Sequence, residues 1–545
     1  MTKIALILGG GGSLGTYTAG AVTELFRGLA GNRSGATVQV GALAGASSVA
    51  LIAALAARAL VVNPNLVPWI GAAWIRGMDA EVLLSTNRSR SSLLDAEVLE
   101  EMTRALITAG PASDDEPSPL LAEPLGLGIT LSSLHGISYQ LRYGFLNRPD
   151  RSFGTRLFDD WAAFELSPAD SAGASVWEEV RQAAVASASF PFAFPPRRLE
   201  RRGSHFRGSV LEDLGELDMW YTDGGLFNNE PIRLAKLLVA RAGSEGDDWR
   251  FVFVDPTLRD PPPDDVAEGA APGSAVQVAS LVARALLGQG SAKDWIRANR
   301  TNERLAILDS LVDRLPEIAD SLTDPEAFEL GRSVGEMAES VCERRLVLGL
   351  GGRSRRAGRP AEGADPVLEL LEESLERIER RYSNVLARVS SRAARSRLAK
   401  LIFLIEAASG LDDKEELPLY LVAPGHRLAG DFLGNFGGLF SQEWREADYR
   451  AGRRDAKRLL ETSLADLVEY EPDEEAEYEV PEMVGSVEAL RPEQRRRLER
   501  LIERGVDRSI GEMDPGFLGS LLGFAWKPAL RRWATARAID SLRAS

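Results

Sequence analysis

One apolar stretch, residues 38–55, limits the possible folds of this chain more than any other segment. The part that ends at Ala44 is apolar with β-branched members, which is typical of a strand buried on both faces. The part from Ser48 onward is apolar on every side, which is typical of a buried helix. Ser47 is therefore predicted to lie where a buried strand turns sharply into a buried helix.

A serine at such a turn is typical of a nucleophile elbow, in which a tight turn exposes the hydroxyl above the sheet. The start of a helix behind it also favours negative charge at this place. The pattern G-x-S-x-G is matched by Gly45 and Ser47, but Val49 stands at its last position. Because glycine and serine often occur at this spacing, this stretch alone leaves a purely structural turn open.

A second strand-to-helix turn begins at the N-terminus. Residues 3–8 predict a buried strand, four glycines follow at Gly9–Gly12, and residues 17–25 predict a helix. Consecutive glycines in this position leave backbone N–H groups free to bind an anion. Residues 10–15 fit the dinucleotide fingerprint, but no acid ends the next strand, and the lysine of a phosphate-binding P-loop is absent. Two interpretations of the glycine loop stay open: an oxyanion hole, or a tight connection between strand and helix with no role in chemistry.

A third stretch, residues 220–232, contains an aspartate followed by two glycines, which alone is usually a turn. Here the turn leads into Asn-Asn-Glu-Pro, a polar entry to another helix. Gly224 and Gly225 would allow the backbone to hold Asp223 at a fixed, close approach.

Together these stretches resemble the patatin-like phospholipase family. The resemblance covers residues 8–22, 45–53 and 221–231, and also residues 186–196, which are similar to the family's segment A-S-x-A-x-P-x-x-F-P-P. Residues 432–454 resemble a C-terminal segment of a bacterial branch of patatin-related proteins. The first four blocks, residues 8–22, 45–53, 186–196 and 221–231, occur in the family's order. The resemblance therefore implies a serine hydrolase that acts on fatty acyl esters.

The resemblance implies a role for each matching residue. Ser47 would be the nucleophile and Asp223 the base, and the N–H groups of Gly10, Gly11 and Gly12 would bind the oxyanion. Support for the elbow and loops would come from Gly15, Gly45, Gly224 and Gly225. Two positions depart from the family pattern: Val49 replaces a small residue, and Leu14 replaces a cation.

The fold class predicted for the chain is α/β, a mainly parallel sheet flanked by helices in the three-layer patatin-like arrangement. Further strands are predicted at residues 250–256 and 417–424, and a hairpin at 127–143 with His135 in its turn. Apolar residues at steps of three and four from Leu368 to Val389 predict packed helices. The predicted parts are a catalytic core (1–260), a helical insertion (261–410), a return to the core (411–465), and an acidic loop with C-terminal helices (466–545).

Composition restricts the partners. The net charge of −16 opposes binding to nucleic acid and to anionic membranes. A single cysteine, Cys342, fits a reducing compartment, and neither a signal peptide nor a membrane span is expected. We therefore expect a cytoplasmic protein. Residues 515–540 are cationic, carry a tryptophan and are predicted to be amphipathic, so they either dock on the core or contact the inner membrane peripherally.

The sequence predicts no cofactor and no metal, because the three histidines are far apart and no Cys/His pair has ligand spacing. A Ser-His-Asp triad that uses His426 is less favoured than a Ser-Asp dyad. Two alternatives to the lipid acyl hydrolase stay open. One is a catalytically weak or silent patatin-fold scaffold, and the other is an effector that a partner activates.

Overall fold

A computed structural model describes most of the chain. The described residues are 1–31, 38–80, 83, 94, 96–109, 116–145, 148–170, 173–191, 193–206, 211, 213–242, 247–258, 293–317, 324–347, 365–389, 391–411, 416–432, 435–468, 491–493, 495–496, 499–500 and 503. The acidic loop at 469–479 and the amphipathic segment 515–540 lie outside them. Two compact units are formed, one by residues 1–138, 156–295 and 418–545, and the other by residues 139–155 and 296–417.

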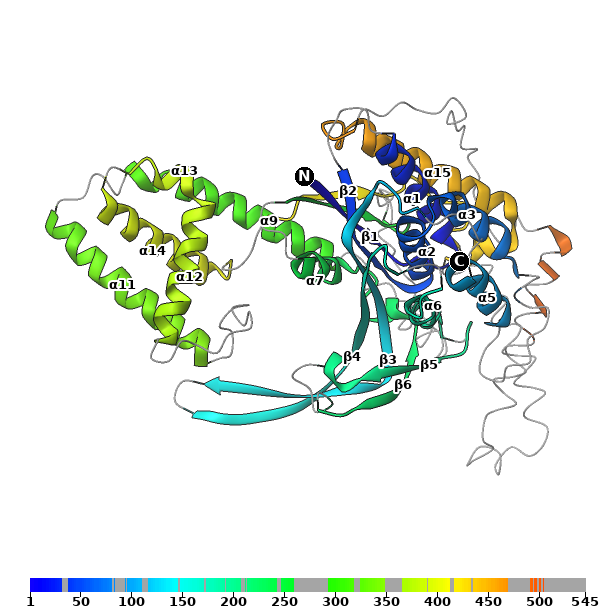
Figure 1. The fold of residues 1–545 in the computed structure, drawn as a ribbon, viewed down its shortest axis with the longest axis horizontal. Helices are drawn as coiled ribbons and strands as arrows, with labels where there is room; N and C mark the ends of the chain where they lie inside the picture. The colour runs from blue at the N-terminus through cyan, green and yellow to red at the C-terminus, as the bar shows by residue number, and fades with distance from the viewer. Residues whose placement is uncertain are drawn as a thin grey trace, which may run out of the picture. The chain divides into compact units, whose positions relative to one another are not determined.

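The first unit is built on a mixed, mostly parallel sheet (Figure 1). Its strands are β1 (Thr2–Leu8), β2 (Val38–Gly45), β3 (Leu121–Phe145), β4 (Arg148–Leu166), β5 (Arg197–Arg202), β6 (Glu216–Thr222), β7 (Asp248–Val254) and β8 (Leu419–Val422). They follow the order β5-β6-β3-β2-β1-β7-β8, and β4 pairs with β3. The pairs from β3 through β2, β1 and β7 to β8 are parallel, whereas β6 is antiparallel to β3 and β5. This sheet with its flanking helices confirms the predicted fold class.

The register of the central strands brings the glycine loop and the elbow together. Leu8, the last residue of β1, is paired with Gly45 at the end of β2 and with Val254 at the end of β7. The segments that follow these strands therefore leave the sheet at the same edge. In parallel α/β sheets this carboxyl edge is where ligands bind.

Helices cover this sheet. They are α1 (Gly15–Ala30), α2 (Ala50–Val61), α3 (Val67–Ala72), α5 (Ala96–Thr103), α6 (Val176–Ser187), α7 (Ile232–Ala242) and α15 (Gln442–Glu461). The closest helix packing is between α1 and α15, which meet at glycines. A Cβ added at Gly20 would lie 2.0 Å from the carbonyl oxygen of Tyr449, and one added at Gly452 would lie 1.9 Å from that of Tyr17. Glycine at both positions is what allows the two backbones to approach this closely.

The predicted hairpin at 127–143 is wrong. The structure has one continuous strand there, β3, and its hairpin partner is β4. Gly136 has a positive φ of 70° but does not reverse the chain, and His135 lies exposed in the middle of the strand. The glycine therefore marks a local irregularity in a strand, where the sequence indicated a turn.

The second unit is mainly helical and has a core of its own. Its helices are α9 (Lys293–Val312), α11 (Asp324–Val347), α12 (Pro366–Arg381), α13 (Ser383–Leu386) and α14 (Arg392–Ser409). The predicted apolar seam is largely buried in this core, for example at Leu371, Ile378 and Val389, but Leu368 is 47% exposed. The strand predicted after this region forms as β8 in the first unit. No helix among the described residues is both long and apolar enough to span a bilayer.

Candidate active site

Ser47 occupies a strained turn between β2 and α2. Its φ is 55°, a left-handed conformation that residues other than glycine rarely adopt. The turn is held to the sheet because the N–H of Ala46 donates to the carbonyl of Leu8 (3.2 Å). A Cβ at Gly45 would lie 2.8 Å from the Cβ of Ala53, so a larger residue would push the helix away from the strand. This geometry is that of a nucleophile elbow.

Asp223 lies directly beside the serine. The hydroxyl of Ser47 donates to Oδ2 of Asp223 across 2.6 Å, and the N–H of Gly225 donates to Oδ1 across 2.7 Å. The N–H of Asp223 in turn donates to the carbonyl of Ser189 (3.0 Å). Ser189 belongs to the fourth block singled out in the sequence, so that block fixes the position of the aspartate.

Burial dominates the protonation of Asp223. The carboxyl is removed from solvent, which raises its pKa from 3.8 to about 7, while the hydrogen bonds from Ser47 and Gly225 act in the opposite direction. A carboxyl with a pKa near neutrality can both accept and return a proton at physiological pH. The electrostatics of the site therefore suit a general base.

The glycine loop contributes fewer candidate donors than the sequence indicated. The N–H of Gly10 donates to the carbonyl of Asn229 (3.2 Å), and Nδ2 of Asn229 donates to the carbonyl of Gly10 (3.0 Å). The amide of Gly10 is thus already engaged, and the candidates for binding an oxyanion narrow to the N–H groups of Gly11 and Gly12. Gly12 has a φ of 58°, and its carbonyl accepts a hydrogen bond from the hydroxyl of Ser48 (2.9 Å).

The supporting glycines each allow a close approach. A Cβ at Gly15 would lie 2.7 Å from the ring of Trp74, and one at Gly224 would lie 2.2 Å from the carbonyl oxygen of Thr130. The two departures from the family pattern, Leu14 and Val49, are both buried in the hydrophobic core. Their side chains therefore pack into the fold, and Ser47 still reaches Asp223.

An apolar cavity opens next to Ser47 and Asp223. Its wall is formed by aliphatic and aromatic side chains from several elements, together with the residues of the turn: Gly12, Ser13, Ser48, Leu51, Trp74, Met78, Leu83, Leu99, Ala188, Phe190, Phe194, Phe436 and Leu439. A cavity of this kind would favour a hydrocarbon chain over a charged group.

Several of these residues escaped the sequence analysis. Asn229 and Ser48 hold the glycine loop, and Phe436 and Leu439 line the cavity from a segment far along the chain. The asparagine-rich run after Asp223 was a signal for Asn229. The position of Ser48 after the elbow gives no sign in the sequence that its hydroxyl holds Gly12.

The histidines do not complete a triad. Ser47 donates directly to a carboxylate, while His135 and His426 are exposed. Within the described part of the chain, no three His, Cys, Asp or Glu side chains come together as a metal site would require. The chemistry offered at this site is thus that of a serine and a carboxyl group.

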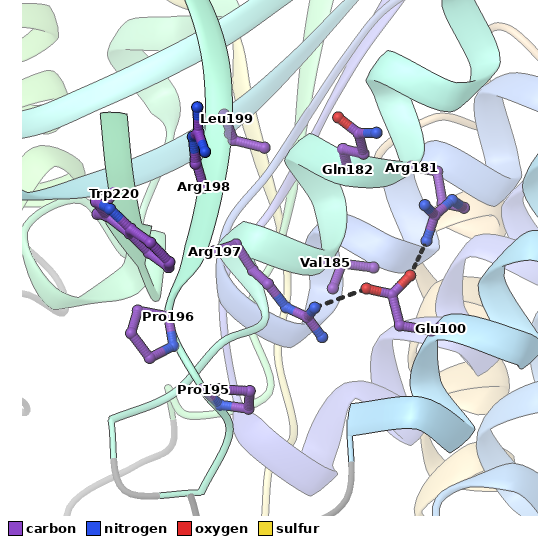
Figure 2. Close-up of a pocket in the computed structure, with 10 residues that line it drawn as sticks. All are labelled: Glu100, Arg181, Gln182, Val185, Pro195, Pro196, Arg197, Arg198, Leu199 and Trp220. Atoms are coloured by element: carbon purple, nitrogen blue, oxygen red, sulfur yellow. Dashed lines mark hydrogen bonds and ion pairs between the residues drawn. The ribbon is translucent and has the colours of Figure 1, made fainter. Parts of the chain in front are cut away.

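A second cleft is lined by charged and apolar side chains. Figure 2 shows Glu100 between two arginines, Arg181 and Arg197, with which it forms ion pairs. Arg198 from the same strand as Arg197 is paired with Asp218. The described residues that line this cleft include no serine, threonine or cysteine, so we do not assign it a role in catalysis.

Residues 6–236 match the family model described as patatin-like phospholipase. The matched segment contains the elbow, the glycine loop and Asp223. No curated protein matches the chain.

Proposed function

Because the chain belongs to the patatin-like phospholipase family through residues 6–236, we propose that it hydrolyses fatty acyl esters with Ser47 as nucleophile and Asp223 as base. One observation carries this proposal above all others, the 2.6 Å hydrogen bond from the serine hydroxyl to the buried carboxyl. The family alone supports a lipid acyl hydrolase in general. The residues and steps below are our proposal.

In the first half of the reaction, Oγ of Ser47 attacks the carbonyl carbon of the ester, and its proton moves to Oδ2 of Asp223. The carbonyl oxygen becomes an oxyanion, which the N–H groups of Gly11 and Gly12 stabilise. Removing one such donor in other hydrolases costs about 3–4 kcal/mol of transition-state stabilisation. The intermediate then collapses, the C–O bond to the alcohol breaks, and Asp223 returns the proton to the departing oxygen.

In the second half, water attacks the acyl-enzyme. Asp223 accepts a proton from the water, and a second tetrahedral intermediate forms in the same oxyanion site. Its collapse breaks the bond to Oγ of Ser47, releases the fatty acid and returns the proton to the serine. The raised pKa of Asp223 suits both halves, because the same group must take up and give back a proton.

The cavity supports an acyl chain as the group that is bound beside the nucleophile. It is lined by Leu51, Trp74, Met78 and other apolar residues, with no lysine or arginine among the described lining residues, so its surface favours the hydrocarbon part of the substrate over a charged part. The alcohol or lipid head group would leave on the open side.

The test is hydrolysis of p-nitrophenyl esters by the purified protein at pH 8. We expect turnover that falls by at least about 10³-fold in both Ser47→Ala and Asp223→Asn. The loss must occur in variants whose thermal unfolding is still cooperative. Turnover that persists in folded Ser47→Ala would refute the proposed nucleophile, and no turnover by the unaltered protein on any ester would favour the silent scaffold.

A further inference from the structure

The family match ends at residue 236, yet a segment near residue 435 contacts the candidate site. We call residues 428–432 and 435–440 the cover segment. Building on the proposed function, we infer that the cover segment is a working part of the active site: it holds the glycine loop in position, and its residues Phe436 and Leu439 limit the acyl chain that the cavity accepts.

The first contact is with the glycine loop. Both the N–H and the hydroxyl of Ser13 donate to the carbonyl of Asn435, across 2.8 and 2.7 Å. The N–H of Gly438 donates to the hydroxyl oxygen of Ser13 across 3.0 Å. A Cβ added at Gly12 would lie 2.8 Å from the same Asn435 oxygen. The cover segment therefore fixes the residue that follows the two candidate oxyanion donors.

Arg445 of α15 joins the cover segment to another wall of the cavity. Its guanidinium is almost completely buried and donates from Nη1 to the carbonyl of Gly438 (2.7 Å) and from Nε to the carbonyl of Ile75 (2.7 Å). It also pairs with Asp79 through Nη2 (3.1 Å). Trp74 and Met78, which line the cavity, flank the carbonyl that Arg445 holds. The guanidinium of Arg445 therefore sets the distance between the cover segment and the cavity wall around Ile75.

Asp448, one turn further along α15, anchors the start of the cover segment. Its two carboxylate oxygens accept the N–H groups of Ala429 (2.7 Å) and Gly430 (3.0 Å), and all of these groups are buried. Since α15 is itself packed tightly on α1, the cover segment is tied to the helix that follows the glycine loop. The position of the segment is therefore determined from both ends.

Two of the apolar side chains of the cover segment face the substrate side. Phe436 and Leu439 line the cavity that contains Ser47, and the ring of Phe436 meets that of Phe190 edge to face with 5.1 Å between centroids. Phe436 and Leu439 are therefore the residues of the cover segment whose size bears directly on the length of acyl chain that the cavity accepts.

The test compares p-nitrophenyl esters with acyl chains of four to twelve carbons. In Phe436→Ala and in Leu439→Ala, we expect the ratio of kcat/KM for the longest to the shortest ester to rise by roughly 10-fold, because the cavity is enlarged. Leu464→Ala is the matched control: Leu464 is buried in the same hydrophobic core but lies outside the cover segment and does not line the cavity, so its ratio should stay unchanged.

A second arm tests positioning. Arg445→Met should lower kcat by roughly 10-fold or more with a smaller change in KM for the shortest ester, because the glycine loop loses its support but the short chain still binds. Arg454→Met, on the same helix but paired with its neighbour Asp455 and, among the described residues, with no other acid, should change neither. If Arg445→Met does not fold, the chain-length arm still decides.

Three results would overturn the inference in distinguishable ways. If the unaltered protein turns over but Phe436→Ala and Leu439→Ala keep its chain-length ratio, the cover segment does not set specificity, and the proposed function stands. If folded Arg445→Met keeps its kcat, the segment does not position the glycine loop. If the unaltered protein hydrolyses no ester, the proposed function fails, and this inference fails with it.

Discussion

The hydroxyl of Ser47 lies 2.6 Å from Oδ2 of Asp223, a residue 176 positions further along the chain. The serine follows β2 and the aspartate follows β6, and only β3 separates these strands in the sheet. The two side chains therefore meet because two strand ends approach each other, and the glycines beside them allow that approach.

The rate should depend on pH through Asp223. The reaction needs the carboxylate form, and burial raises the pKa of Asp223 to about 7. We expect kcat/KM to rise about tenfold per pH unit below this value and to level off above it. A pH profile measured between 5 and 9 on a short ester checks this. A profile that is flat across this range would contradict the assignment of Asp223 as base.

The stability of the fold should fall as the pH rises, whereas the rate should increase. The folded state keeps the proton on Asp223 up to a pH of about 7, whereas the unfolded chain releases it near 3.8. The folded protein therefore loses stability from this group as the pH rises from about 4 to 7, by at most about 4 kcal/mol. Asp223→Asn removes this loss, so its Tm relative to the unaltered protein should be higher at pH 8 than at pH 5. Thermal unfolding at both pH values measures the difference, and an equal difference at both would contradict the raised pKa.

Gly12→Ala should lower kcat by more than its loss of stability explains. Gly12 has a φ of 58°, and a Cβ there would lie 2.8 Å from the carbonyl oxygen of Asn435. Gly410 has a similar φ of 67° with no atom near its Cβ position, so Gly410→Ala carries the backbone strain of about 1 kcal/mol without the clash. We expect both variants to lose stability and only Gly12→Ala to lose kcat. Equal kcat in the two variants would argue against a role for the glycine loop.

Gly452→Ala should separate α15 from α1. The added Cβ would lie 1.9 Å from the carbonyl oxygen of Tyr17, and no flexible side chain is there to yield. We expect the free energy of unfolding to fall by about 3 kcal/mol. Gly215→Ala, which has open space at its Cβ position, is the control and should unfold as the unaltered protein does. Denaturant titration of both variants gives the comparison.

Local patterns predicted the centre of the molecule well. The apolar strands ending at Leu8 and Gly45 each lead into a glycine-bearing turn and a helix, and such strands pair in parallel. The mostly parallel sheet follows from these patterns. The approach of Ser47 to Asp223 does not, because β6 runs antiparallel to β3: Thr222 pairs with Ser132, three residues beyond Ile129, the partner of Gly45.

Other features depend on contacts that no local pattern encodes. The hydrogen bond between Ser13 and Asn435 joins residues 422 positions apart, and nothing in the segment around Asn435 predicts its partner. The engagement of the Gly10 amide by Asn229 has the same origin. At Gly136 the local pattern predicted a turn, but the structure has an irregular strand. A glycine between apolar runs fits both.

The most direct test of the account is covalent labelling with a fluorophosphonate at pH 8, followed by intact mass and peptide mapping. We predict one adduct per chain, on Ser47, that is absent in Ser47→Ala and retained in Ser48→Ala. Labelling that is missing from the unaltered protein, or that persists in Ser47→Ala, would contradict the claim that Ser47 is a nucleophile activated by Asp223.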